Sequence, residues 1–143
     1  FLTAAPELLA LIAKAHQFVT FTTPTNLQRA VAAGLTQNDT YFDTLMNDQQ
    51  AKRDLIESGL RDAGFETLHT GGTYFLSVDI RSVGFEGDDV EFCEHLIRDA
   101  GVAAIPLSAF YQAGDVRHFV RFCFCKHDDV LGAAAAKLKA HFQ

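Results

Sequence analysis

A single arginine stands inside an apolar segment near the C-terminal end of the sequence. Arg121 lies between Val120 and Phe122 in the stretch RHFVRFCFCK (117–126), whose composition is typical of a buried strand. Burying an unpaired guanidinium is costly, so the side chain needs an anionic partner or a route to solvent. Its planar donors match both oxygens of a carboxylate, and it cannot lose its charge at physiological pH.

Two interpretations of Arg121 remain open from the residues alone. The side chain could pair with an acidic residue of its own chain or reach solvent along its aliphatic stem. It could instead bind the carboxylate of a small molecule. The nearest acidic residues in the sequence are Asp115 and Asp128, which leaves room for a small-molecule anion.

The remaining polar residues do not form a recognisable catalytic set. No serine, histidine and aspartate stand in a triad-like arrangement, so we expect no complete catalytic site in this chain. Acidic residues near 88–94 are interpreted as a solvated, capped helix start. The histidines lack paired ligand spacing, so we expect surface or helix-end positions and no metal site; they are His16, His69, His95, His118, His127 and His141.

The three cysteines also lack the spacing of a zinc site. Cys93, Cys123 and Cys125 are interpreted as small apolar residues in a reducing compartment, and we therefore expect a cytoplasmic protein. Cys123 and Cys125 are two positions apart in an expected strand, where a disulfide is geometrically unfavourable.

Composition restricts the classes of partner. The chain has 143 residues, of which 48% are hydrophobic and 21% charged, as is usual for a globular domain. Its formal net charge of -6 argues against binding to nucleic acid or to an anionic membrane. No apolar run reaches the roughly 18 residues that a bilayer span requires.

Periodicity predicts an α/β (α+β) arrangement that positions Arg121 on a sheet. From residue 39 onward the order is α-β-β-α-β-β-α, with helices packed on a three- to four-stranded, largely antiparallel sheet. The strands are expected near 66–68, 73–80, 102–110 and 118–125, the third of them broken by Pro106, and the helices at 39–63, 90–100 and 128–142.

Residues 1–38 carry two helical patterns and an extended link without strands. The first residue is not methionine, and neither a basic leader nor a cleavage site precedes the first helix. We therefore expect a fragment in which 1–38 end a neighbouring domain and 39–143 form a small C-terminal domain.

Four segments together resemble the C-terminal part of fold-type I, pyridoxal-phosphate-dependent aminotransferases of class I/II. The likeness is greatest to the branch of kynurenine, glutamine and methionine aminotransferases, and it covers nearly the whole chain. The segments are HQFVTFTTPTNLQRAVAAGL (16–35), KRDLIESGLRDAGFETLHTGGTYFLSVDI (52–80), GVAAIPLSAFY (101–111) and VRFCFCKHDDVLGAAAAKL (120–138).

The resemblance implies roles for three residues. Arg121 matches the arginine that binds the substrate α-carboxylate, and Phe21 matches an aromatic residue of the substrate pocket in the partner subunit of a homodimer. Thr22 stands where some members have histidine. The implied reaction moves an amino group between an amino acid, of aromatic, methionine or glutamine type, and a 2-oxo acid.

The resemblance also implies parts that this sequence does not contain. The Schiff-base lysine lies in a motif upstream of residue 1, and pyridoxal 5'-phosphate is bound mainly by that upstream part, including the large domain that 1–38 would end. We expect the chain alone to be inactive. The alternative is a non-catalytic α/β module that uses Arg121 to bind an amino acid or another carboxylate.

Overall fold

The computed structural model describes residues 1–114 and 116–143, which divide into two compact units, 1–42 and 43–143. The division falls inside helix α3 (Asp39–Asp62), shortly after the boundary predicted between residues 38 and 39. That the first unit ends a cofactor-binding domain remains a prediction. No helix in the described part of the chain combines the length and apolar character needed to cross a bilayer.

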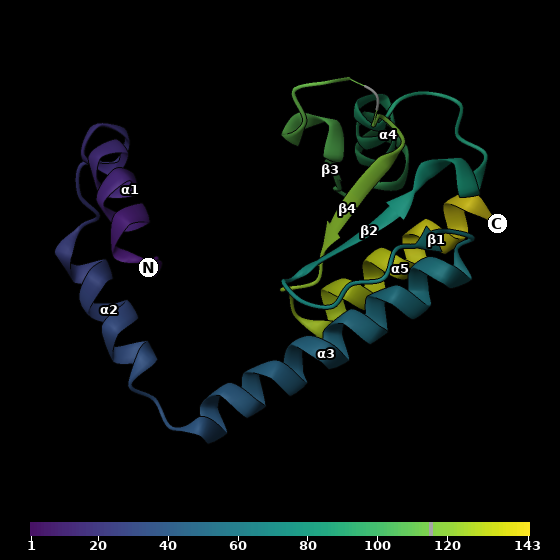
Figure 1. Cartoon of the computed structure of the whole chain (residues 1–143). Helices are drawn as coiled ribbons and strands as arrows, with labels where there is room; N and C mark the ends of the chain where they lie inside the picture. The colour runs from purple at the N-terminus through teal and green to yellow at the C-terminus, as the bar shows by residue number, and fades with distance from the viewer. Residues whose placement is uncertain (115) are drawn as a thin grey trace. The chain divides into compact units, whose positions relative to one another are not determined.

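The first unit consists of helices α1 (Pro6–Val19) and α2 (Thr25–Leu35), joined by a short link (Figure 1). Proline at the first turn of α1 suits a position whose N–H would have no helical partner, and Glu7 favours the positive end of the helix dipole. Neither helix contains a buried residue. Apolar side chains such as Leu11 and Phe18 remain exposed, so within 1–42 the two helices enclose no core.

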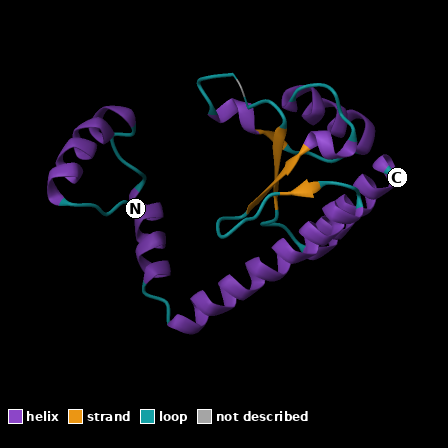
Figure 2. Cartoon of the chain, turned by 45° about the vertical axis from the view of Figure 1, so that its right-hand side comes forward, coloured by secondary structure: helices purple, strands orange, loops and turns teal. Residues whose placement is uncertain are grey.

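The second unit combines helices with a small sheet, as predicted (Figure 2). After α3 the elements are β1 (Glu66–Thr67), β2 (Phe75–Asp79), the 3-10 turn η1 (Ile80–Val83), α4 (Asp89–His95), the π-helical turn η2 (Leu96–Ala100), β3 (Ile105–Pro106), the 3-10 turn η3 (Leu107–Phe110), β4 (Phe119–Cys123) and α5 (Asp128–Phe142).

In the described residues the four strands form one antiparallel sheet in the order β1-β2-β4-β3. This confirms the predicted fold class. β4 is therefore an inner strand, paired to β2 on one side and to β3 on the other. Arg121 lies opposite Ser77 of β2 and opposite Ile105 of β3.

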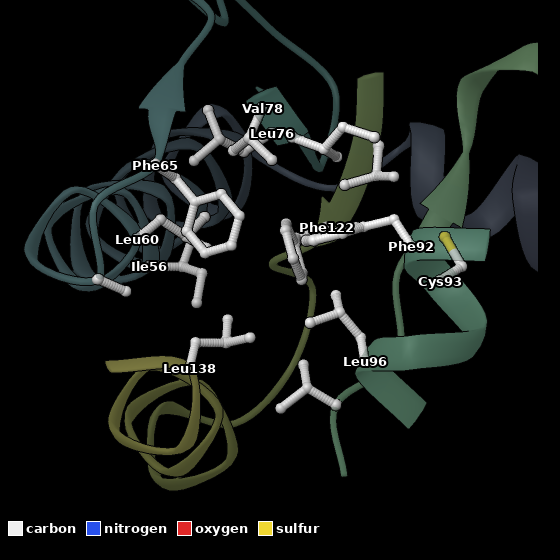
Figure 3. Close-up of a cluster of buried hydrophobic side chains, with 14 of the residues drawn as sticks. Ile56, Leu60, Phe65, Leu76, Val78, Phe92, Cys93, Leu96, Phe122 and Leu138 are labelled. Carbon is white, nitrogen blue, oxygen red and sulfur yellow. The ribbon is translucent and has the colours of Figure 1, made fainter. Parts of the chain in front are cut away.

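One face of the sheet is covered by helices and forms the hydrophobic core (Figure 3). Alternation along β4 places Val120 and Phe122 on that face, both almost fully buried. They pack with side chains of α3, α4 and α5, including Leu60, Phe92 and Leu138. Because side chains alternate along a strand, Arg121 is directed to the opposite face.

All four strands are shorter than the sequence predicted, and the differences in β4 and β3 bear on the site. β4 ends at Cys123, so Cys125 lies beyond the strand and is exposed. β3 stops at Pro106, which has no N–H to donate to the sheet, and the chain then turns into η3. This early turn brings Phe110 to the sheet instead of leaving it in an extended strand.

Candidate functional site

Arg121 is flanked by two aromatic rings on the face of the sheet opposite the core. Its guanidinium carbon lies 4.0 Å from the ring centroid of Phe75 on β2 and 4.2 Å from that of Phe110 on η3. Both distances fall within the range of cation–π attraction. The rings restrict where the guanidinium can lie, and the neighbouring segments thereby hold it in place.

The guanidinium keeps unused hydrogen-bonding capacity. The Nε atom of Arg121 is buried and has no hydrogen-bond partner among the described residues. No carboxylate of the described residues lies within 4.0 Å of the Arg121 guanidinium. The eight ion pairs of the described chain all involve other residues. Asp128 does not pair with it, and Asp115 lies outside the described residues. A buried donor without a partner is costly, so this site favours an anionic ligand.

Phe21 and Thr22 lie in the link between α1 and α2, in the first unit. Phe21 has φ 64°, a left-handed conformation that is rare for a bulky residue, and its side chain is 76% exposed. Its N–H donates to the carbonyl of His16 at 2.9 Å, which ends α1 and fixes this turn. The aromatic ring of Phe21 is thus exposed at the surface of its unit.

A pocket within the first unit includes both predicted residues of this link. Phe21 and Thr22 line it together with His16 and residues of α2 such as Leu27. Arg121 belongs to the second unit. The predicted roles of these residues therefore rest on separate local geometries.

One buried acidic residue was misread in the sequence. Asp89 was interpreted as part of a solvated helix start, but it is fully buried. Asp88 is the residue that caps α4, and it forms a capping box with Glu91. The carboxylate of Asp89 instead accepts hydrogen bonds from the N–H and the hydroxyl of Ser108.

Asp89 thereby anchors the turn η3, which carries Phe110 against Arg121. One local signal points to this role, because a second aspartate directly after a capping aspartate is not needed for the cap itself. Its partner, Ser108, lies 19 residues away, and nothing in the local pattern indicates that pairing.

Comparison with known proteins agrees with the four sequence motifs. The family model described as aminotransferase class I and II matches residues 1–138. A probable N-succinyldiaminopimelate aminotransferase of Mycobacterium tuberculosis is 40% identical, over 92% of this chain and 35% of the relative. The methionine aminotransferase of Escherichia coli is 39% identical, over 95% of this chain and 35% of its own length.

Two further comparisons extend the agreement to a third relative and to structure. The kynurenine–oxoglutarate transaminase of Dictyostelium discoideum is 35% identical, over 90% of this chain and 34% of that protein. A solved structure of N-succinyldiaminopimelate aminotransferase from Mycobacterium tuberculosis has a TM-score of 0.81 at 41% identity. It is matched by 94% of this chain, which covers 35% of it.

The chain thus spans about a third of the length of the curated relatives that it matches. The family match nevertheless extends over nearly all of its residues, and the predicted resemblance is confirmed. This chain belongs to the class I and II aminotransferase family.

Proposed function

We propose that this chain is the C-terminal part of a pyridoxal-phosphate-dependent aminotransferase in which Arg121 binds the α-carboxylate of the substrate. The observation that carries the proposal is the buried Nε of Arg121, which has no partner among the described residues. The guanidinium lies between Phe75 and Phe110, which restrict its position without satisfying its donors. A substrate carboxylate supplies the missing acceptors.

In this mechanism Arg121 positions the substrate. A carboxylate held by two parallel N–H donors cannot rotate freely, so the bonds at the substrate's α-carbon keep a fixed direction. Orientation of this kind lowers a reaction barrier by several kcal/mol. The same contact rejects amines without a carboxylate, because they would leave the buried Nε of the guanidinium without an acceptor.

Pyridoxal 5'-phosphate, when bound, supplies the electron sink for chemistry at the substrate's α-carbon. The residues around Arg121 suit a carboxylate of the substrate: the orphaned donor belongs to a guanidinium flanked by two aromatic rings. We place the cofactor mainly in the part of the protein that corresponds to the remaining two-thirds of the relatives. We propose that the catalytic lysine also lies in that part and that this chain contains no catalytic residue.

We propose an amino acid of aromatic, methionine or glutamine type and a 2-oxo acid as the substrates. The names of two relatives, a methionine aminotransferase and a kynurenine–oxoglutarate transaminase, support this range. Because one relative is named a probable N-succinyldiaminopimelate aminotransferase, activity on that compound should be measured beside activity on these amino acids. The alternative of a non-catalytic carboxylate-binding module is disfavoured by the family match over residues 1–138.

The proposal includes a homodimer in the cytoplasm. Residues 1–38 would end the large domain, 39–143 would form the small domain, and Phe21 and Thr22 would contribute to the partner's substrate pocket. The exposed ring of Phe21 and the exposed apolar residues of α1 and α2 support this, because such surfaces need cover. The free thiols of Cys93, Cys123 and Cys125 fit a reducing compartment.

Substitution of Arg121 in the protein as its gene encodes it tests the proposal. Two charge-assisted hydrogen bonds contribute about 1.5–3 kcal/mol each, so Arg121→Ala should lower kcat/KM for an amino acid roughly 100-fold or more. Arg121→Lys keeps the charge but loses the paired donors, and it should be impaired nearly as much. The visible absorbance of the cofactor should stay unchanged in both.

Arg98→Lys is the matched control, because Arg98 is exposed and its nearest carboxylate, on Glu94, is 3.8 Å away. Near-normal turnover of amino acids by both Arg121 variants would refute carboxylate binding. Loss of activity together with loss of the cofactor absorbance would indicate a structural defect and would equally count against a role in substrate binding alone.

A further inference from the structure

Two histidines that are far apart in the sequence point their ring nitrogens at each other on the surface of the second unit. His95 is the last residue of α4, and His141 lies in the last turn of α5. Their Nε2 atoms are 2.9 Å apart, and their ring centroids are 4.9 Å apart. The rings therefore face each other nearly tip to tip.

The other nitrogen of His95 is held by a carboxylate. Its Nδ1 lies 2.7 Å from Oδ2 of Asp99, one turn further along the helix. When Nδ1 carries the proton and donates to Asp99, the lone pair of the imidazole is on Nε2, directed at His141. This carboxylate–histidine pairing is the one that orients most histidines that bind metals. Asp99 is part of η2, a π-helical turn, and such turns are frequent at functional sites.

We propose that His95 and His141 together bind a divalent transition metal ion and that water fills its remaining coordination positions. Zn²⁺ serves as the ion for the geometry below and as the probe in the test. Zinc–nitrogen bonds of about 2.0–2.1 Å at a tetrahedral angle place the two nitrogens about 3.3 Å apart. The observed separation of 2.9 Å therefore needs a widening of only about 0.4 Å, within the reach of two side chains at helix ends.

The surroundings define the kind of metal and the strength of binding. Imidazole ligands suit Zn²⁺, Cu²⁺ and Ni²⁺, and no thiolate takes part, because Cys93 turns into the hydrophobic core (Figure 3). The described residues contain no group of three or more histidine, cysteine or carboxylate ligands, so two waters complete the site and it is weaker than a closed structural one.

Such a metal would fasten the end of the chain to the rest of the second unit. α5 contributes His141 and α4 contributes His95, so the ion links these two helices. Phe142 of α5 already packs against the ring of His95. The proposal requires no part of the substrate site, and none of the residues that flank Arg121 belongs to it. It can fail or succeed independently of the aminotransferase reaction.

The simpler explanation is a direct hydrogen bond between the two imidazoles. A glutamine at position 141 preserves that bond, because its amide can donate to Nε2 of His95, but it is a poor ligand for zinc. His141→Gln therefore separates the two explanations. His127→Gln is the matched control, since His127 is an exposed histidine directly before the same helix.

Zinc titration by calorimetry of the chelator-treated, cofactor-loaded protein provides the test. We expect one ion per chain in the unmodified protein and in His127→Gln, and at least a tenfold weaker affinity in His141→Gln. Asp99→Asn should weaken binding roughly 10- to 100-fold, because it removes the carboxylate that orients His95. Zinc should raise Tm by a few degrees in the unmodified protein and much less in His141→Gln.

Equal zinc affinity in the unmodified protein and His141→Gln would overturn the proposal, and so would the absence of saturable binding in both. In either case the two histidines form a hydrogen bond only.

Discussion

The buried carboxylate of Asp89 holds Ser108 by two hydrogen bonds, one from the backbone N–H at 2.7 Å and one from the hydroxyl at 2.8 Å. Asp89 is the first residue of α4, and Ser108 lies in η3. The N–H of Asp89 also donates to the carbonyl of Arg117, just before β4. One residue thus fixes two segments: its side chain holds the turn that carries Phe110, and its backbone N–H holds the approach to the strand that carries Arg121.

Replacing Asp89 should therefore destabilise the second unit. Asp89→Ala leaves the part-buried N–H and hydroxyl of Ser108 without their acceptor, and we expect the free energy of unfolding to fall by about 1–3 kcal/mol. Urea denaturation measures the loss. Glu94→Ala, an exposed change in the same helix, should stay within about 0.5 kcal/mol. Equal stability of the two variants would show that Asp89 does not anchor η3.

Phe110 should affect substrate binding through Arg121. Phe110→Leu keeps an apolar side chain but removes the ring that lies 4.2 Å from the guanidinium. Cation–π contacts contribute about 0.5–2 kcal/mol, so we expect KM for an amino acid to rise roughly 2- to 30-fold. Steady-state kinetics measures this, and the KM of Tyr111→Phe, a change at the adjacent exposed residue, should not move. An unchanged KM in Phe110→Leu would exclude the positioning role.

Two glycines in the paired helices should respond in opposite directions to alanine. A Cβ atom at Gly59 of α3 would lie 2.4 Å from the Cβ of Ala135 of α5, so Gly59→Ala forces the helices apart. We expect a loss of about 1–3 kcal/mol in the free energy of unfolding.

A Cβ atom added at Gly132 of α5 would have no neighbouring atom within 4 Å outside its own helix turn. Gly132→Ala should raise the free energy of unfolding by about 0.5–1 kcal/mol, because alanine restricts the unfolded chain and favours the helix. Thermal or urea unfolding of both variants checks the pair. An unchanged or raised free energy of unfolding in Gly59→Ala would mean that α3 and α5 are not in close contact at Gly59.

The cysteines should differ in their reaction with iodoacetamide. Burial raises the pKa of the Cys93 thiol to about 11, so very little of the reactive thiolate is present near pH 8. Cys125 is exposed. We expect peptide mass spectrometry at pH 8 to find Cys125 labelled well before Cys93, and Cys125→Ser should remove the fast phase. Raising the pH toward 11 should speed labelling of Cys93; comparable labelling of both at pH 8 would contradict the burial of Cys93.

Most of the fold could be predicted from sequence, because its signals are local. Apolar spacing located α3 and α5, and the apolar strand patterns located β2 and β4. The length of β3 was overestimated, since Pro106 ends the pairing there and Leu107–Phe110 curl into a turn. That turn depends on Asp89, whose partner no local pattern identifies.

The candidate site was predictable only in part for the same reason. Arg121 was conspicuous, because a charge inside an apolar strand demands an explanation. Its aromatic neighbours come from β2 and η3, 46 positions before it and 11 before it, and only the folded chain brings them together. The meeting of His95 and His141 is equally non-local.

The two outer strands of the described sheet, β1 and β3, are each only two residues long, and one residue of β3 is proline. An incoming peptide would find almost no row of free backbone donors and acceptors on which to extend the ladder. This unit is consequently a poor template for amyloid-like growth, because a further strand could pair with only two residues at either edge.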